Sequence, residues 1–202
     1  MGRGYDWEQR YSEVARLFGE TPSELLVAEK HRLQTGMSAL AAGDGEGRNG
    51  VWLAEQGLQV VAIDISATAL QRSRMLAEQR GVHIETLCTD LLNWSWPSSR
   101  FDVITSIFIH LPDPLRRQLH RSMLQALKPG GLLLIEGFHV DQVGLDSGGP
   151  SDPTLMLSET VLEQDFPEAE ILRLERVTTQ VETAGVCQGE GAALHFVARR
   201  PA

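Results

Sequence analysis

Residues 40–50, LAAGDGEGRNG, combine four glycines with two carboxylates, Asp44 and Glu46. Glycine-rich loops that follow a strand usually bind phosphates through backbone N–H groups. A carboxylate opposes that use, because at about 4 Å from a phosphate oxygen it costs about 4 kcal/mol near a protein surface. Residues 45–50 satisfy the dinucleotide pattern G-x-G-x-x-G, but that pattern alone is a weak signal, and Arg48 offsets only part of the repulsion. The loop therefore favours a cationic nucleoside that lacks phosphates.

Two further acids follow predicted strands. Asp64 ends the apolar run 58–64, and Asp90 comes just after the run 82–88. Open α/β sheets bind ligands at the carboxyl ends of their strands, and S-adenosylmethionine is a cationic nucleoside without phosphates. We expect the two oxygens of Asp64 to accept the ribose hydroxyls, and Asp90 to accept the adenine amino group beside the N–H of Leu91. The alternative is that each acid only caps the helix that follows it.

The elements that position these acids alternate between apolar runs and helical patterns, which is typical of a parallel sheet. Strands are predicted at 37–42, 58–64, 82–88, 101–107 and 132–138. Helices are predicted at 22–34, from Ser66 to the stop at Gly81, from Pro112 to the LKPGG turn, and from Ser158. A long loop covers 139–153, and two final strands, 168–182 and 192–200, are joined by a turn at 185–191.

Composition excludes several classes of protein. A length of 202 residues suits one domain. The net charge of -9 disfavours nucleic acid as a partner. The first residues lack the apolar core of a signal peptide, and no apolar run is long enough to cross a bilayer. Cys88 and Cys187 form neither a disulfide framework nor a metal-ligand spacing. We therefore expect a soluble cytoplasmic protein; its oligomeric state is not predicted.

The combination of these motifs resembles the class I S-adenosylmethionine-dependent methyltransferases. GDGEGRNGVWLAEQG followed by VVAIDIS is similar to the branch that contains the tellurite-resistance and thiopurine methyltransferases. The glycine loop, the two strand-end acids and an LKPGG turn occur in that family in the same order. The resemblance implies one α/β domain with a Rossmann-like, doubly wound, mostly parallel seven-stranded sheet, helices on both faces and an antiparallel C-terminal hairpin. It divides the chain into an N-terminal helical lid segment (1–35), a cofactor-binding core (36–138) and a C-terminal part (139–202).

The resemblance also assigns residues to the cofactor, which is S-adenosylmethionine with S-adenosylhomocysteine as product. Those residues are Gly43, Asp44, Gly45, Glu46, Gly47, Arg48, Asn49, Asp64, Ile65, Asp90, Leu91 and Ile107. Many members of the family carry an acid two residues before the first loop glycine, where this chain has Ala41. We expect Asp44 or Glu46 to compensate for that loss.

The acceptor pocket is less defined. His110 follows the fourth predicted strand and is a candidate to orient or deprotonate an acceptor; the alternative is a polar turn residue. The lid segment contributes Trp7, Tyr11, Phe18 and Gly19, whose aromatic rings could instead pack on the sheet. The sequence SIFIHLP after that strand differs from the motif of amino-group nucleic-acid methyltransferases, so we expect a small-molecule acceptor. Soft sulfur, selenium or tellurium nucleophiles need little deprotonation, and no metal site is predicted.

Two other functions stay open at this stage. A nicotinamide-dependent oxidoreductase would use the same kind of sheet, but its cofactor's phosphates conflict with the acidic loop. A non-catalytic regulatory protein that binds S-adenosylmethionine would explain Ala41 and the lack of an assignable base. A comparison of the affinities for adenosyl ligands and for NAD distinguishes a methyltransferase from the oxidoreductase. Turnover of a methyl acceptor distinguishes it from the regulatory protein.

Overall fold

The computed structural model describes residues 6–183 and 187–202. Seven strands form one sheet in the order β3-β2-β1-β4-β5-β7-β6. The strands are β1 (Ser38–Ala42), β2 (Gln59–Asp64), β3 (Glu85–Cys88), β4 (Phe101–Ile107), β5 (Leu127–Phe138), β6 (Glu170–Thr183) and β7 (Cys187–Arg199). The strands β1 to β5 run parallel to one another. β7 runs antiparallel to both β5 and β6, which confirms the mixed sheet with a C-terminal hairpin.

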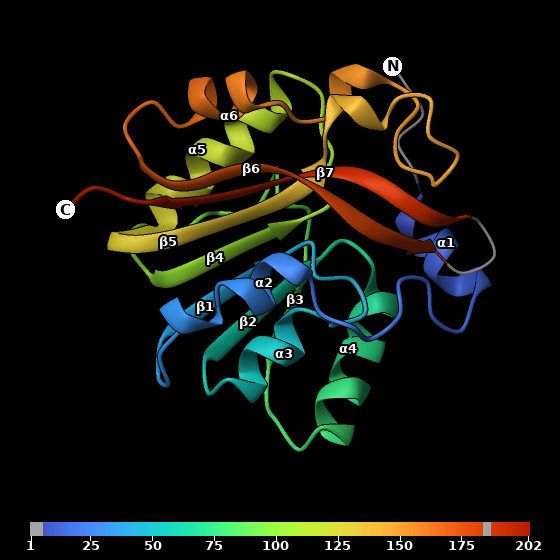
Figure 1. Cartoon of the computed structure of the whole chain (residues 1–202). Coiled ribbons are helices and arrows are strands. Elements are labelled where there is room, and N and C mark those ends of the chain that lie inside the picture. The colour runs from blue at the N-terminus through green and yellow to red at the C-terminus, as the bar shows by residue number, and fades with distance from the viewer. Residues whose placement is uncertain (1–5, 184–186) are drawn as a thin grey trace.

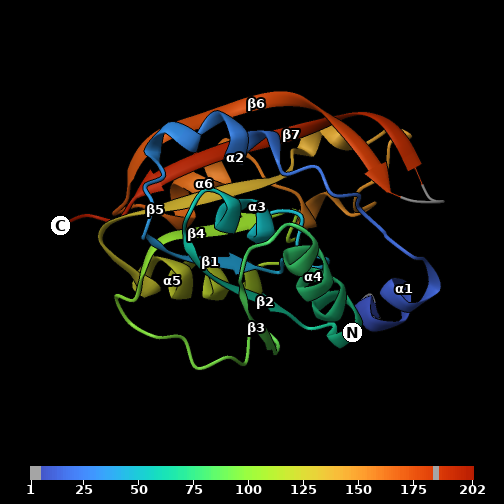
Figure 2. The same ribbon diagram turned by 90° about the horizontal axis from the view of Figure 1, so that it is seen from below.

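Helices cover both faces of the sheet (Figures 1 and 2). They are α1 (Trp7–Glu13), α2 (Glu24–Ala28), α3 (Gly50–Glu55), α4 (Ala67–Gln79), α5 (Leu115–Ala126) and α6 (Glu159–Asp165), with short 3-10 helices η1 (Lys30–Arg32), η2 (Val140–Gln142) and η3 (Pro153–Leu155). α2, α3 and α4 lie on one face, while α5 and α6 lie on the other. α1 lies beyond the carboxyl ends of the parallel strands and contacts α4.

Two apolar cores, one on each face, hold these layers together. On one face Leu119 and Met123 of α5 and Phe166, just after α6, pack against the sheet, and all three side chains are buried. On the other face Leu26 of α2 and Leu53 of α3 are fully buried. Burial of a large apolar side chain stabilises the fold by about 1.5–3 kcal/mol, so both faces of the sheet contribute.

Several helices and strands begin or end at other residues than the sequence predicted. The helix predicted at 22–34 forms only as α2 and η1. β5 begins five residues earlier than predicted, because the LKPGG segment joins the strand after α5 ends at Ala126. β3 is shorter than the predicted run and starts at Glu85. β7 starts at Cys187, so the predicted turn at 185–191 is mostly strand, and its first residues lie outside the described part of the chain.

The long loop predicted at 139–153 does connect β5 to the next helix, and η2 and η3 lie at its two ends. Ser158 is the predicted start of the last helix, and its side chain accepts a hydrogen bond from the N–H of Val161 as the N-cap of α6. Ser66 caps α4 in the same way, with the N–H of Ala69 as donor. Both helix starts are confirmed.

Candidate active site

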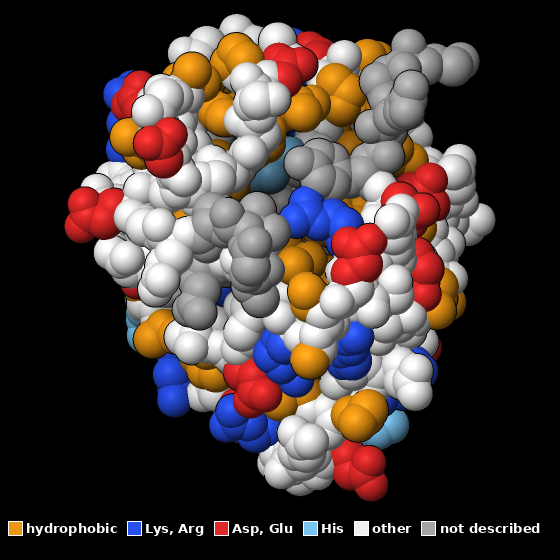
Figure 3. Space-filling view, turned by 90° about the vertical axis from the view of Figure 1, so that its right-hand side faces the viewer, with side chains coloured by type: hydrophobic (Ala, Val, Ile, Leu, Met, Phe, Trp, Pro, Cys, Tyr) orange, Lys and Arg blue, Asp and Glu red, His pale blue; other side chains and the backbone are white. Residues whose placement is uncertain are grey.

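The glycine loop lies at the carboxyl ends of the parallel strands, where β1 runs into α3. Gly43, Gly45 and Gly47 all have positive φ angles, of 59°, 58° and 91°. A Cβ added to Gly47 would come within 2.9 Å of the Ser73 Cα on α4. Glycine is therefore required both by the backbone conformation and by the close approach of α4. Figure 3 looks onto this end of the molecule and shows a histidine in a hollow beside a basic side chain.

Asp44 is buried inside the turn of the loop. Its Oδ1 accepts a hydrogen bond of 2.9 Å from the N–H of Gly50, at the first residue of α3. Its Oδ2 is buried and has no hydrogen-bond partner among the described residues. Burial, together with the nearby charge of Asp64, raises the pKa of Asp44 to about 7, although the Gly50 N–H acts in the opposite direction. A buried carboxylate with one free oxygen is stabilised by a cation, so this residue fits a cationic ligand and opposes a phosphate.

Asp64 ties the end of β2 to the loop. Its Oδ2 accepts from the N–H of Gly45 at 2.8 Å, and its Oδ1 accepts from the N–H of Ser66 at 2.9 Å. Burial raises its pKa, which these two backbone donors partly offset. Each carboxylate oxygen has a second lone pair. Asp64 therefore keeps acceptor capacity for a ribose while it also organises the helix start. Ile65 beside it is exposed.

Asp90 lies just past β3 and is partly buried. Its Oδ1 accepts from the N–H of Leu92 at 2.9 Å, and its Oδ2 accepts from the side-chain amide of Asn93 at 2.7 Å. These contacts form a local turn, and no helix lies between β3 and β4, a stretch that the structure describes in full, so Asp90 does not cap a helix as the alternative supposed. The predicted bonds from an adenine to Asp90 and to the N–H of Leu91 stay predictions. Ile107 ends β4 and is buried in the core on the α2 side of the sheet.

The other polar side chains of the loop bind an N-terminal strap, which we define as residues 14–23 between α1 and α2. Glu46 accepts from the N–H of Leu17 at 2.7 Å, and its other oxygen accepts from Arg72 at 2.8 Å. The Asn49 side chain accepts from the N–H of Ser23 at 2.9 Å. An Arg48 N–H donates to the Thr21 carbonyl at 3.3 Å. Contacts to the methionine portion by Glu46, Arg48 and Asn49 stay predictions, because in this structure their side chains fasten the strap.

Tyr11 of α1 closes over the loop. A Cβ on Gly45 would lie 2.4 Å from the Tyr11 Oη, so the phenol rests directly on the glycine backbone. The ring contacts the rings of Trp7 and Phe18, with centroids 6.0 and 6.3 Å away. Burial and then the carboxylate of Asp64 raise the pKa of this phenol, so it stays protonated. The aromatic residues of the lid segment therefore pack on one another and on the loop rather than on the sheet. Gly19, the remaining residue named in the lid segment, has a φ of 69° and lies in the strap.

Glu8 was not among the predicted site residues, although it holds α1 in place. Its carboxylate accepts from the hydroxyls of Ser66 and Thr68, both at 2.6 Å, at the N-terminus of α4. A carboxylate at a helix N-terminus also interacts favourably with the helix dipole. Nothing local to Glu8 in the sequence indicates this pairing, because its partners lie about sixty residues away.

His110 lies just beyond β4 among aromatic rings. Its ring stacks on Phe138 at 5.4 Å, and the Phe108 ring centroid is 6.2 Å away. Nδ1 lies 3.1 Å from the Leu155 carbonyl oxygen, which can only accept, so Nδ1 carries the proton. Nε2 is buried and has no partner among the described residues. Burial lowers the pKa of His110 to about 4, so the imidazole is neutral and Nε2 presents a free lone pair.

A buried acid in β5 links the strap to the hairpin. The Ser23 hydroxyl donates to Glu136, and the second oxygen of Glu136 lies 3.3 Å from Nε2 of His195 on β7. Glu136 and His195 are opposite each other in the register of the two strands. Sequence reasoning missed this cluster, because a single acid in an apolar strand and a histidine near the C-terminus carry no shared motif.

The described part of the chain contains no group of three His, Cys, Asp or Glu side chains that could hold a metal ion. In residues 6–183 and 187–202 we also find no helix that is long and apolar enough to cross a bilayer. Cys88 is exposed and unpaired by any disulfide.

Comparison with known proteins gives the class. Residues 39–131 match the family described as "Methyltransferase domain". Together with the fold and the acidic glycine loop, this match, which covers slightly less than half of the chain, supports a class I methyltransferase domain that uses S-adenosylmethionine. The resemblance inferred from the sequence is confirmed at this level, and a nicotinamide cofactor is not supported.

Individual relatives are more distant. The chain is 29% identical over 130 residues to the ubiquinone biosynthesis O-methyltransferase of Coxiella burnetii, covering 63% of this chain and 55% of that protein. It is 32% identical over 151 residues to a probable thiol methyltransferase 2 of Arabidopsis thaliana, covering 71% of this chain and 65% of that one. The fold is similar to that of N-methyltransferase NodS from Bradyrhizobium japonicum in complex with S-adenosyl-L-homocysteine, with a TM-score of 0.67, 21% identity, and coverage of 99% and 90%. The chain thus spans only about half the length of the first of these relatives.

Proposed function

We propose that the protein transfers a methyl group from S-adenosylmethionine to a small acceptor with a soft nucleophile, such as a thiol or selenol. When bound, this cofactor supplies an electrophilic methyl group on a sulfonium. The observation that carries the proposal is His110, a neutral imidazole whose buried Nε2 lone pair has no partner among the described residues. The likeness to a thiol methyltransferase and the resemblance to the tellurite-resistance and thiopurine branch support the choice of acceptor.

The low basicity of His110 limits the acceptors that it can deprotonate. A thiol with a pKa near 8.5 gives up its proton more readily than a phenol with a pKa near 10, and this difference corresponds to about 2 kcal/mol. For an imidazole whose pKa is lowered to about 4, proton transfer from a thiol is therefore less unfavourable than proton transfer from a phenol. In the proposed step Nε2 of His110 would take the S–H proton of the acceptor. The bound cofactor would supply the methyl group to the acceptor sulfur and leave as S-adenosylhomocysteine.

The residues around the glycine loop would hold the cofactor. We assign the methionine portion to 43–49 with Ile107 nearby, the ribose to Asp64 beside Ile65, and the adenine to Asp90 and Leu91. The orphaned oxygen of Asp44 offers a place for positive charge. Tyr11, which rests on Gly45, would cover the methionine portion and exclude water from it. Catalysis is then chiefly positioning, with the nucleophile held about 3 Å from the methyl carbon.

The test measures the rate at which S-adenosylhomocysteine forms when thiols, selenite, tellurite and phenols are offered one at a time as methyl acceptors. We expect turnover with thiols, and His110→Ala should lower kcat about 100-fold at pH 7. The loss should shrink at pH 9, because the thiol then ionises without help. His83→Ala is the matched control, since His83 is exposed on the surface. Binding of S-adenosylmethionine without turnover of any acceptor would instead support a non-catalytic regulatory protein.

A further inference from the structure

A cavity of about 380 Å³ lies at the end of the sheet opposite the glycine loop. Met37 precedes β1, Asp102 is the second residue of β4, and Arg199 ends β7. The cavity therefore sits at the amino ends of the parallel strands, whereas the candidate active site sits at their carboxyl ends. Nothing in the proposed methyl transfer uses it.

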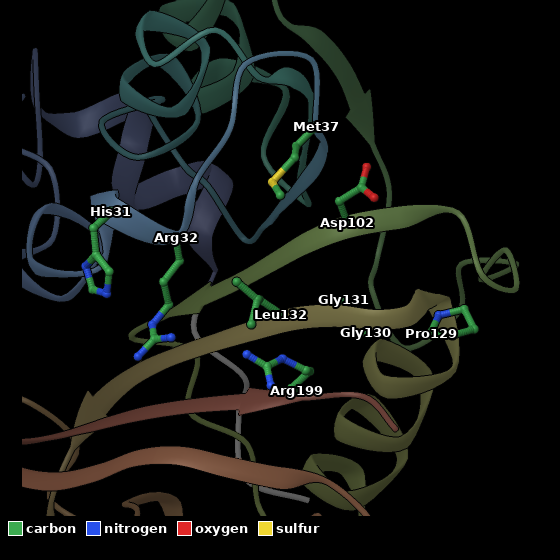
Figure 4. A pocket seen from close by; sticks show the side chains of 9 residues that line it. All are labelled: His31, Arg32, Met37, Asp102, Pro129, Gly130, Gly131, Leu132 and Arg199. Carbon is green, nitrogen blue, oxygen red and sulfur yellow. The ribbon is translucent and has the colours of Figure 1, made fainter. Parts of the chain in front are cut away.

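Basic side chains from two distant parts of the chain converge on this cavity. His31 and Arg32 come from η1, and Arg199 comes from the C-terminal hairpin. In Figure 4 the guanidinium groups of Arg32 and Arg199 are directed toward each other beside the Leu132 side chain. Two cations placed around one opening repel each other, and an anion between them removes that repulsion.

Both arginines keep donors available. Nε of Arg32 donates to Glu29 at 2.6 Å, and one terminal nitrogen of Arg199 donates to Glu170 at 2.8 Å. We find no further partner for either guanidinium among the residues that the structure describes. A guanidinium has five N–H donors in a planar fork that matches the geometry of a carboxylate or phosphate. Each arginine is therefore held at one nitrogen while others remain free for a ligand.

The single acid that lines the cavity is already neutralised. Oδ2 of Asp102 accepts from the Ser38 N–H and hydroxyl, at 2.8 and 2.7 Å, and from Nζ of Lys128 at 2.8 Å. Although partial burial acts in the opposite direction, the hydrogen bonds from Lys128 and Ser38 lower the pKa of Asp102. Its charge is thus balanced by Lys128. The two acids that pair with Arg32 and Arg199, Glu29 and Glu170, are not among the lining residues, so the guanidinium groups are the charged groups that remain to face a ligand.

The remainder of the wall is apolar or free of side chains. Met37 and Leu132 contribute apolar surface. Gly130 lies in the first part of β5, and a Cβ added to it would meet no atom within 4 Å. The cavity is therefore open beside Gly130 and offers an apolar surface next to the two cations.

We propose that this cavity is a binding site for a small organic anion that carries a carboxylate or phosphate next to a short apolar segment. The oxyanion lies between the guanidinium groups of Arg32 and Arg199, and the apolar segment packs on Met37 and Leu132. The proposal stands independently of the methyl acceptor, because it uses none of the residues of the candidate active site.

Calorimetric titration of the whole chain tests this site, with inorganic phosphate, succinate and citrate as probes and sodium chloride at matched ionic strength as reference. We expect 1:1 binding of at least one probe, and the preferred probe separates phosphate from carboxylate ligands. Arg32→Gln and Arg199→Gln should each weaken binding at least about tenfold, because each removes a charge-assisted pair.

Arg74→Gln is the matched control, since this arginine on α4 is exposed and, within residues 6–183 and 187–202, donates to Thr86 alone. It should leave the affinity for the probe unchanged, and all three variants should keep the affinity of the parent for S-adenosylhomocysteine, which reports an intact fold. The proposal is wrong if no probe binds more tightly than chloride, or if Arg74→Gln weakens binding as much as the other two substitutions.

Discussion

The affinity for S-adenosylmethionine should depend on the protonation of Asp44. In the free protein, burial raises the pKa of this carboxyl from 3.8 to about 7. A cation binds well beside the ionised form and poorly beside the neutral form, so the affinity should rise with pH until Asp44 is fully ionised. With a pKa near 7, the ionised fraction rises from about one tenth at pH 6 to about nine tenths at pH 8, which predicts about a tenfold gain in affinity.

S-adenosylhomocysteine is the natural control for this effect. It has the same adenosine, amino group and carboxylate, but its sulfur carries no charge. The ratio of their affinities therefore reports how the charge on the sulfur affects binding. We expect this ratio to increase between pH 6 and pH 8. Calorimetry at pH 7 in two buffers of different ionisation enthalpy should also show release of up to about half a proton.

Asp44→Asn is the second test of this prediction, because its amide oxygen can still accept a hydrogen bond from the Gly50 N–H but the side chain does not ionise. The ratio of affinities in this variant should not change with pH. The free variant should also be more stable than the parent at pH 8. Raising the pKa of a carboxyl from 3.8 to about 7 destabilises the folded state by at most about 4 kcal/mol above pH 7, and this cost disappears as the pH falls toward 4. A ratio that is independent of pH in the parent protein would refute the placement of the sulfonium near Asp44.

Three further outcomes follow from contacts described above. Glu8→Gln removes the carboxylate that accepts from two hydroxyls of α4, so S-adenosylhomocysteine should dissociate faster in stopped-flow displacement, while Glu13→Gln should leave the rate unchanged. Gly47→Ala forces a Cβ to 2.9 Å from the Ser73 Cα at a φ of 91°, and urea unfolding should show a loss of about 1–3 kcal/mol. Asp165, whose pKa is lowered to about 2 by hydrogen bonds from His120 and an arginine despite partial burial, should contribute about 2 kcal/mol of stability above pH 4 that is lost between pH 4 and pH 2. Asp165→Asn should therefore differ from the parent in free energy of unfolding at pH 6 and approach it in acid.

Local patterns in the sequence predicted the sheet well. β1, β2 and β4 are short, largely apolar runs, and the N-caps of α4 and α6 depend on Ser66 and Ser158, whose partners are three residues away. Such signals are contained within a few residues. The helix predicted at 22–34 formed only in part, because contacts with distant segments are not visible in its local pattern. Leu25 and Leu26 are fully buried in α2, and Glu29, just after α2, pairs with Arg32 and with Arg173 of the distant β6.

The contacts that organise the candidate site could not be predicted in the same way. Glu46 meets the N–H of Leu17 across 29 positions, and Ser23 meets Glu136 across 113. The sequence indicated that the loop is acidic, but the direction in which each acid points is decided by which segment folds over it. In the structure Glu46 points to the strap, whereas Asp44 turns into the loop and keeps one oxygen free.

The position of α1 affects how this protein can be handled and measured. α1 begins at Trp7 and places Tyr11 on the loop glycine, while the C-terminus lies at the opposite side of the molecule (Figure 1). An affinity tag or fluorophore attached ahead of α1 would add mass and charge to the segment that covers the loop, and kinetics measured on such a fusion would describe the altered cover. A label attached after Ala202 stays remote from the loop, so C-terminal fusions are the sound choice for ligand-binding measurements.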